Sequence, residues 1–410
     1  MRQPRGRCRF CGAPLTHTFS DLGMSPIANN FLGEEQLGRM EPFYPLHALV
    51  CDRCFLVQLE EFEGPEEIFS DYAYFSSYST SWLAHCRRYA QMATERFGLS
   101  RGSHGVEVAS NDGYLLRYFA EQDIPVLGVE PAANVAEVAV EQGIPTVVEF
   151  FGEETAKGLA EDRQADLLIG NNVLAHVPDL NDFVEGMKVL LAPEGVITME
   201  FPHLERLVED RQFDTIYHEH FSYFSLPTVR RVFAAHDLAV FDVEELPTHG
   251  GSLRIYACHV GTRPVSDAVR GVEAREERGG LTNIDTYLAF GELVQQEKRD
   301  ILESLIGLKN DGNRIAGYGA PAKGNTLLNF CGIGTEFIDF TADRSPHKQG
   351  RYLPGSHIPI RAPEEIERER PDVVFILPWN LREEIMEQLR VVSDWGGRFL
   401  VRSPALELYA

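Results

Sequence analysis

The segment 215–225, TIYHEHFSYFS, gathers two histidines, a carboxylate and two tyrosines among aromatic side chains. His220 can accept a proton near neutral pH, Glu219 can orient its imidazole and raise its basicity, and Tyr217 can donate a hydrogen bond to a developing oxyanion. The HEH order lacks the HExxH spacing that places two histidines on one helix face, so we expect no metal here. The segment predicts acid–base chemistry of the kind that forms an enolate. A polar aromatic cluster capped by Ser225 before a helix is the alternative.

A second candidate site is the segment GVEVASNDGYLL, which runs from an apolar strand through a small polar turn into a helix. Such a turn lets backbone amides and the helix N-terminus face a ligand. Glu107 in the strand can accept from an amino group, and Glu130, about twenty residues on, ends the next strand, where a carboxylate can bind ribose hydroxyls. The other residues expected to line this site are Ser110, Asn111, Asp112 and Gly113 in the turn, and Phe150, Asn171 and Asn172 at the ends of the third and fourth strands.

The ligand of this turn is expected to carry an adenosine ribose. Taken alone, this feature also fits an enzyme that uses a nicotinamide cofactor. The turn lacks the GxGxxG pattern that lets a pyrophosphate approach closely, and its acidic residues suit a sulfonium cation better than a diphosphate. We therefore expect S-adenosylmethionine (SAM) as the cofactor. An ordinary turn with solvated acids is the alternative. His176, in NNVLAHVPD, either holds a substrate or caps a turn.

Four of the seven cysteines form two CxxC pairs, Cys8 with Cys11 and Cys51 with Cys54. Four thiolates on tight turns satisfy the tetrahedral preference of zinc, and a metal with all four positions filled by protein is structural. Two unrelated pairs of free thiols are one alternative. A redox-active CxxC is another, although neither pair follows a βαβ pattern.

The composition of the chain limits how many domains it can form and which partners it can bind. Its 410 residues are 44% hydrophobic and 24% charged, which suits two or three domains. The formal net charge of -24 repels nucleic acid and anionic lipid, so neither is expected as a partner. The sequence has no run of about 20 apolar residues and no apolar signal-peptide core, which favours a cytoplasmic location. The oligomeric state stays open, and a monomer is compatible with the sequence.

Strands and helices alternate after a helix predicted from Ser79 to Phe97, which indicates a parallel sheet in an α/β fold. The strands are predicted at 105–109, 125–130, 166–172, 195–201, 238–246 and 252–260. The last two have no helix between them, so we expect them to pair antiparallel at one edge. A long polar helix over 264–309, interrupted near Gly279, leads to a second α/β unit with a small sheet of its own.

Six motifs, in this order, resemble the sugar C-methyltransferases of bacterial natural-product pathways that make branched deoxysugars. They are the CxxC pairs with LGMSPIANNFL between them, DYAYFSSYS, VEVASNDGYLL, YHEHFSYFS, HGGSLR and GYGAPAKGNTLLN. The resemblance spans nearly the full chain. It implies a zinc-binding domain at 1–75, a class I SAM methyltransferase domain with a Rossmann-like sheet at 76–262, and a helical linker with a Rossmann-like α/β domain at 263–410.

The resemblance also implies a substrate and residue roles. A dTDP-linked 4-ketosugar would lie between the last two domains, and a base would remove the proton at C3 so that the resulting enolate attacks the SAM methyl group. By matching motifs, His220 would be the base with Glu219 and Tyr217 as support. The substrate contacts implied are Tyr72 or Tyr74, His176, and the turn that carries Lys323 and Asn325, whose backbone amides and ammonium would bind the diphosphate.

Other functions remain open at this stage. A methyltransferase acting on a sugar oxygen or nitrogen would need a base but no adjacent ketone. A nucleotide-sugar oxidoreductase or epimerase could use a similar sheet, although the GxGxxG pattern is missing. A zinc-bearing binding protein without activity would leave the YHEH cluster unexplained.

Overall fold

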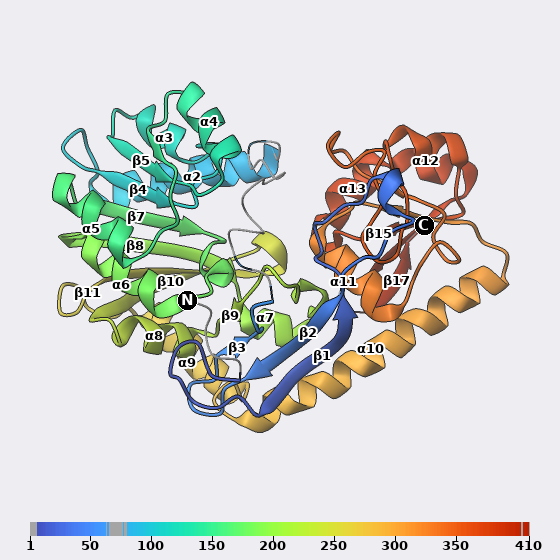
Figure 1. Cartoon of the computed structure of the whole chain (residues 1–410), viewed down its shortest axis with the longest axis horizontal. Helices are drawn as coiled ribbons and strands as arrows, with labels where there is room; N and C mark the ends of the chain where they lie inside the picture. Colours follow the sequence, from blue (N-terminus) through green and yellow to red (C-terminus); the bar gives the residue numbers. More distant parts are fainter. Residues whose placement is uncertain (1–5, 63, 65–76, 78–79, 403–404, 410) are drawn as a thin grey trace.

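A computed structural model of the chain describes residues 6–409 apart from 63, 65–76, 78–79 and 403–404. Tyr72 and Tyr74 therefore lie outside the described residues. Figure 1 shows two lobes side by side, with β1 (His17–Ser25) and β2 (Tyr44–Val50) between them and the long helix α10 (Ile284–Asn310) running below the smaller lobe. The described residues form three sheets.

The larger lobe contains a seven-stranded sheet in the order β10-β11-β8-β7-β4-β5-β6. The strands are β4 (Gly105–Val108), β5 (Val126–Val129), β6 (Thr146–Val147), β7 (Ala165–Asn171), β8 (Leu191–Pro202), β10 (Leu238–Leu246) and β11 (Ser252–His259). Strands β4 to β8 run parallel, whereas β11 lies antiparallel between β8 and β10. All six predicted strands are present, the antiparallel pairing is confirmed, and β6 is an additional strand.

Helices cover both faces of this sheet because its strands are apolar on both sides. Successive side chains of a strand point to opposite faces, so Leu167 packs in the cluster beneath α2 and α3, and Leu168 packs in the cluster beneath α6 and α8. The bounds of the helices are α2 (Thr80–Phe97), α3 (Leu116–Ala120), α4 (Ala133–Glu141), α5 (Glu153–Asp162), α6 (Leu180–Leu190), α7 (Leu204–Glu209) and α8 (Leu226–Ala234). The helix predicted from Ser79 to Phe97 is confirmed as α2.

The N-terminal region does not fold around a core of its own. Its strands β1, β2 and β3 (Val57–Gln58) form a sheet that is completed by β9 (Ser222–Tyr223), which belongs to the YHEHFSYFS motif. Phe19 of β1 stacks on Phe290 of α10 with ring centroids 4.5 Å apart. A module this small buries too little apolar surface by itself. It therefore packs against β9 and α10, which come from later parts of the chain.

The predicted linker helix is two helices, α9 (Asp267–Arg278) and α10, separated where the sequence analysis placed the break. The smaller lobe then follows, with a six-stranded sheet in the order β14-β13-β12-β15-β16-β17 that is parallel except for β17. Its elements are β12 (Ile315–Tyr318), α11 (Ala322–Cys331), β13 (Thr341–Ala342), β14 (Ile360–Arg361), α12 (Glu364–Glu369), β15 (Val373–Ile376), α13 (Arg382–Gln388), β16 (Arg398–Arg402) and β17 (Leu406–Tyr409).

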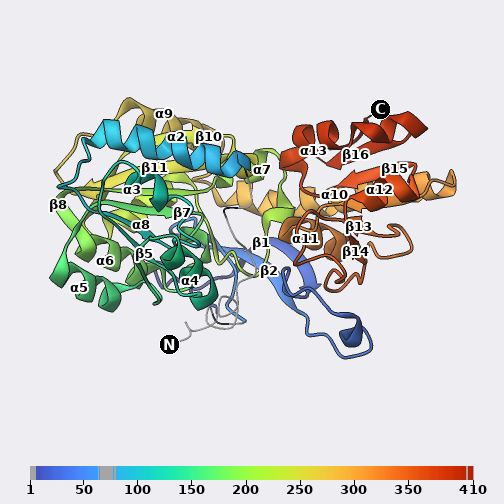
Figure 2. The same ribbon diagram turned by 90° about the horizontal axis from the view of Figure 1, so that it is seen from above.

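The segment between β1 and β2 extends along the smaller lobe, where Figure 2 shows it projecting beside β13 and β14. Leu32 forms a two-way backbone bridge with Tyr352, and the Glu41 carboxylate accepts hydrogen bonds from the Gly355 amide (2.9 Å) and the His357 ring (3.0 Å). These contacts tie the smaller lobe to the N-terminal sheet. Within the described part of the chain, no helix combines the length and apolar character needed to cross a bilayer.

Candidate active site

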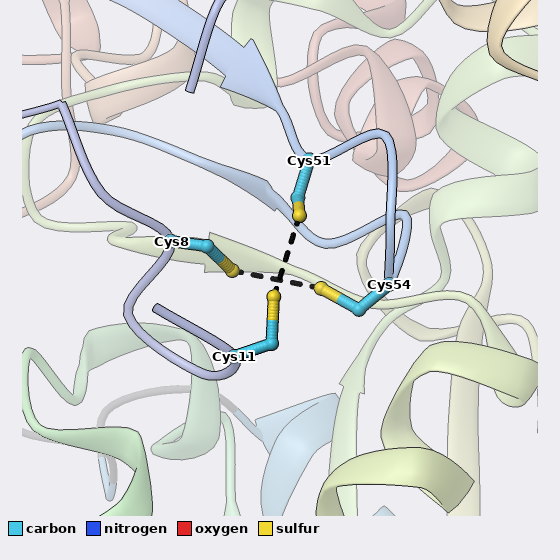
Figure 3. Close-up of side chains that lie close together, drawn as sticks. All are labelled: Cys8, Cys11, Cys51 and Cys54. Carbon is cyan, nitrogen blue, oxygen red and sulfur yellow. Dashed lines mark hydrogen bonds between the residues drawn. The ribbon is translucent and has the colours of Figure 1, made fainter. Parts of the chain in front are cut away.

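The four cysteines predicted to bind zinc converge. Two similar turns carry them, since the Gly12 amide donates to the Cys8 carbonyl and the Phe55 amide donates to the Cys51 carbonyl. The Sγ atoms of Cys8 and Cys54 are 3.5 Å apart, as are those of Cys11 and Cys51, and all four sulfurs lie within 4.8 Å of one another (Figure 3). Zinc with four sulfurs at 2.3 Å forms a tetrahedron with edges of about 3.8 Å, so this cluster fits the metal.

The carboxyl ends of β4 and β5 form the turn predicted to bind the cofactor. Glu130 is buried after β5, and its two oxygens accept hydrogen bonds from the backbone amides of Asn111 and Ala132, both at 2.9 Å. Burial raises the pKa of Glu130 more than these bonds lower it. Gly113 has a φ of +74°, and a Cβ there would lie 3.0 Å from Ile144, so the turn requires glycine. The hydrogen bond from Asn111 to Glu130 thus connects the turn after β4 with the end of β5.

Several polar groups around this turn are buried without a hydrogen-bond partner among the described residues. They are the Ser110 hydroxyl, Oδ1 of Asp112 and both amide atoms of Asn171 at the end of β7. The buried Glu107 carboxylate hydrogen-bonds to the Tyr114 hydroxyl. Burial raises the pKa of Glu107 well above its usual range. Unsatisfied buried groups are costly, so their concentration at one sheet edge fits a ligand with several polar atoms. Phe150, after β6, is 41% exposed and lies at the margin of this set.

The predicted base, His220, is buried, and its hydrogen bonds define its tautomer. Its Nδ1 lies 3.1 Å from the Thr215 carbonyl, which can only accept, so Nδ1 carries the proton in the neutral ring. Its Nε2 therefore has the lone pair, and the Tyr217 hydroxyl, 2.8 Å away, donates to it. The ring of His176 lies 4.7 Å from that of His220, centroid to centroid. The structure thus brings together three of the side chains that the sequence singled out.

Glu219 lies apart from the His220 ring. Its Oε1 accepts a hydrogen bond from the Asn29 amide at 3.1 Å, and its buried Oε2 has no partner among the described residues. Burial raises the pKa of Glu219 to about 7. The groups that orient His220 are therefore Thr215 and Tyr217, whereas the expected orienting contact from Glu219 is absent from the described structure. Asn29, from the LGMSPIANNFL motif, is a site residue that the sequence analysis did not assign.

His249 also joins this group of side chains. It lies in the turn of the HGGSLR motif between β10 and β11, with a φ of 56°, and its Nε2 is 3.2 Å from the amide nitrogen of Asn172. The preceding Thr248 donates to the buried Glu200 carboxylate (2.8 Å), and a Cβ on Gly250 would lie 2.3 Å from Trp379 of the smaller lobe. The motif was noted in the sequence, but no spacing rule connected it with His220.

The smaller lobe contributes Lys323 from α11. Its ammonium donates to the Asn380 side chain at 2.7 Å and lies 4.6 Å from the centre of the Trp379 ring. Burial lowers the pKa of Lys323 to about 8. Burial lowers the pKa of both His220 and His249, and the charge of Lys323 lowers both further. Helix α11 contacts the segment that carries His220, because Thr326 donates to the Ile216 carbonyl at 3.1 Å.

The turn before α11 offers fewer free amides than expected for a diphosphate. The Gly319 amide donates to the Ala342 carbonyl, and the Ala320 amide donates to the Asp343 carboxylate at 2.7 Å. The first turn of α11 has no side-chain cap, so the amides left for an anion are those of the helix N-terminus. Asn325 is buried with neither amide atom hydrogen-bonded among the described residues.

Comparisons with known proteins identify the family. Three family models match in order: "Putative zinc binding domain" over residues 8–69, "Methyltransferase domain" over 82–243, and "C-methyltransferase C-terminal domain" over 247–404. The chain is 38% identical over 404 residues to the C-methyltransferase NovU of Streptomyces niveus, which covers 98% of this chain and 96% of NovU. The chain belongs to the SAM-dependent C-methyltransferases.

Solved structures with a partial likeness to this C-methyltransferase are methyltransferases too. Magnesium protoporphyrin IX methyltransferase of Synechocystis has 12% identity and a TM-score of 0.35, covering 43% of this chain and 83% of that one. The CcbJ methyltransferase of Streptomyces caelestis has 12% identity and a TM-score of 0.34, covering 42% and 89%. The assignment rests on the family models and on NovU, and these low scores add nothing to it.

SAM and zinc are accordingly the groups that this C-methyltransferase uses, and the predicted α/β architecture is confirmed. The buried polar groups at the ends of β4, β5 and β7 are those available to hold SAM. His249 contacts Asn172 at that sheet edge, and Thr326 of α11, the helix that carries Lys323, bonds to Ile216 in the segment that carries Tyr217 and His220. The arrangement can therefore place a base, a phenol and a cation around one substrate.

Proposed function

We propose that this C-methyltransferase transfers the methyl group of SAM to C3 of a dTDP-linked 4-keto-deoxysugar through an enolate. The observation that carries the proposal is the tautomer of His220: the Thr215 carbonyl holds the proton on Nδ1, so Nε2 presents a lone pair toward Tyr217 and the neighbouring histidines. A ketone makes the adjacent carbon acidic, and a positioned neutral imidazole is the base that such a carbon needs.

Burial and nearby positive groups favour the neutral form of His220. Burial lowers the pKa of His220 well below its usual range, and the adjacent His176 lowers it further against the bond to Thr215. Lys323 contributes in the same direction. The imidazole is therefore unprotonated at neutral pH, as a general base must be before reaction. A dTDP diphosphate beside Lys323 would offset that positive charge and make His220 more basic in the complex.

The proposed step conserves protons and electrons. The C3–H bond breaks as its proton passes to Nε2 of His220, and its electron pair becomes the enolate, with negative charge on the C4 oxygen. Tyr217, whose hydroxyl donates to Nε2 in this structure, is then free to donate to that oxygen. C3 would then form its bond to the methyl group as the sulfur–methyl bond of SAM, bound at the acidic turn, breaks. The electron pair of that bond would leave on the sulfur as S-adenosylhomocysteine, and the C4 ketone would be restored. Both His220 and Glu219 are buried, so the base itself is shielded from solvent.

The substrate is proposed to reach across both lobes. Lys323 supplies a positive charge to the diphosphate, and the uncapped N-terminus of α11 supplies backbone amides. Asn325 offers two buried amide atoms, and His176 lies beside the base, where it can contact the sugar. Tyr72 or Tyr74 stays a further proposed contact. On a chain with net charge -24, these local groups are what an anionic substrate requires.

A panel experiment tests the substrate class. The enzyme is incubated with SAM and several dTDP-linked 4-ketosugars, and products are examined for the mass of one added methylene group. In deuterated water without SAM, C3 of the accepted sugar should exchange its proton. Methylation of a sugar oxygen or nitrogen without such exchange would overturn the enolate and favour an O- or N-methyltransferase.

His220→Asn tests the base directly. We expect methyl transfer and deuterium exchange at C3 to fall by about 10²–10⁴-fold, the usual contribution of a general base, with SAM affinity unchanged by calorimetry. His218→Asn is the matched control, because His218 is a buried neighbour whose Nε2 is 3.3 Å from the Pro45 carbonyl instead. Full activity of the His220 variant would contradict the assignment of the base.

A further inference from the structure

The first CxxC turn carries a buried arginine, Arg9, between its two zinc-binding cysteines. Its guanidinium donates to the Pro178 carbonyl at 2.8 Å and to the Leu59 carbonyl at 2.5 Å. It also lies over the Phe221 ring, 5.3 Å from the centroid. These three partners come from three separate segments of the chain, so one side chain holds them together.

Two of these partners adjoin the histidines of the site. Pro178 lies two residues after His176, and Phe221 directly follows His220. Leu59 also contacts the segment of Phe221. Its amide donates to the Phe221 carbonyl at 3.1 Å, and the adjacent strand β3 pairs with β9. The Arg9 side chain therefore bridges the two segments whose histidine rings lie 4.7 Å apart.

The backbone of the zinc turn is fixed to the same segments. Asn181, at the start of α6, donates to the Arg9 and Phe10 carbonyls at 3.2 and 3.0 Å. The Arg9 amide donates to the Gln58 side chain at 2.9 Å, and Gln58 in turn donates to the Cys8 sulfur at 3.3 Å. The conformation of the turn, which the four cysteines define, thus determines where the Arg9 guanidinium lies.

We propose that Arg9 is a positioning residue for methyl transfer: it fixes the segments that carry His176 and His220 relative to each other. The zinc turn would then set active-site geometry in addition to stabilising the N-terminal sheet. Arginine suits this task because its planar fork donates to two carbonyls at once while its face packs on an aromatic ring. Displacing a catalytic group by about 1 Å can cost roughly 10²-fold in rate. The inference rests on the proposed role of His220.

The test compares Arg9→Met and Arg9→Lys with the control Arg7→Met, measuring kcat and KM with the accepted ketosugar, zinc per chain and the thermal midpoint. Arg7 is an exposed arginine next to the same turn, and among the described residues its guanidinium donates to the Gly12 carbonyl at 3.0 Å. We expect Arg9→Met to lower kcat by about 10–100-fold with zinc retained and KM for SAM within twofold. Arg9→Lys should recover part of kcat, because an ammonium can reach one carbonyl but lacks the fork.

Two results would overturn the inference. One is a kcat of Arg9→Met within twofold of the wild type, with zinc bound. The other is a loss of activity that merely follows the fraction of chains without zinc or unfolded, since a purely structural role predicts that. If Arg9→Met does not fold, Arg9→Lys decides by the same criteria. An inactive His220→Asn beside an unaffected Arg9→Met contradicts only the role of Arg9, whereas an active His220→Asn contradicts the proposed base.

Discussion

Two strand–turn–helix segments of this C-methyltransferase have the same backbone plan and opposite charge. The first runs from β4 through SNDG into α3, and the second runs from β12 through GAPAK into α11. Each places a short turn and the first residues of a helix at the carboxyl end of a parallel strand, where open α/β sheets bind ligands. The first carries Glu107 and Asp112 beside Glu130, and the second carries Lys323.

Burial acts on both charges in the way that disfavours them. It raises the pKa of Glu107 and Glu130 and lowers the pKa of Lys323 to about 8. A charged group in a dry site is costly until an opposite charge arrives. We therefore propose that the acidic segment suits the sulfonium and ribose of SAM, whereas Lys323 suits the diphosphate of the proposed substrate.

The glycines of the two turns are required by packing. Gly113 and Gly319 both have positive φ, and added Cβ atoms would lie 3.0 Å from Ile144 and 2.5 Å from Pro378, respectively. Each glycine thus lets its turn pass close to a neighbouring connection, the one before β6 for Gly113 and the one after β15 for Gly319. We expect the charged side chains to set which ligand each turn prefers, so substituting those side chains tests the preference.

Glu130→Ala is expected to have the largest effect, at the acidic turn. It removes the proposed ribose contact and the acceptor for the amides of Asn111 and Ala132, so we expect SAM affinity to fall by about 100-fold or more in calorimetry. Glu141→Ala, which removes an exposed carboxylate at the end of α4, is the control. Unchanged SAM binding in the Glu130 variant would break the comparison on its acidic side.

Lys323→Met should act on the other ligand alone. Loss of one charge-assisted contact predicts a rise of about 10–100-fold in KM for the dTDP-sugar, with SAM affinity within twofold. Lys309→Met, at the end of α10 near the opposite end of β12, serves as the control. A parallel loss of SAM affinity in the Lys323 variant would show that the two turns do not divide the ligands as proposed.

The pH dependence gives the smallest and sharpest effect. Lys323 is charged below its pKa of about 8 and loses its proton as the pH rises through that value, so kcat/KM for the sugar should fall by about fivefold between pH 8 and pH 9. Lys323→Arg should remove this decline, because arginine stays charged. A decline that persists in the arginine variant would belong to another group.

Local patterns in the sequence determined much of the molecule. Apolar runs of strand length fixed the six predicted strands of the larger lobe, and CxxC spacing fixed the zinc ligands, because each depends on residues close together in the chain. The same holds for the acidic turn, because Asn111, Asp112 and Gly113 are consecutive in the sequence. The prediction of acid–base chemistry at the YHEH segment followed from residue types alone and stays a prediction.

Only the tertiary structure decided which distant groups meet. It placed β9 in the N-terminal sheet, paired Glu219 with Asn29 in place of His220, and brought α11, which carries Lys323, into contact with Ile216. It also carried Arg9 of the zinc turn to Pro178. These contacts join segments up to 190 positions apart, as between Asn29 and Glu219. They follow from how apolar faces pack and sheets complete themselves, which no local spacing encodes.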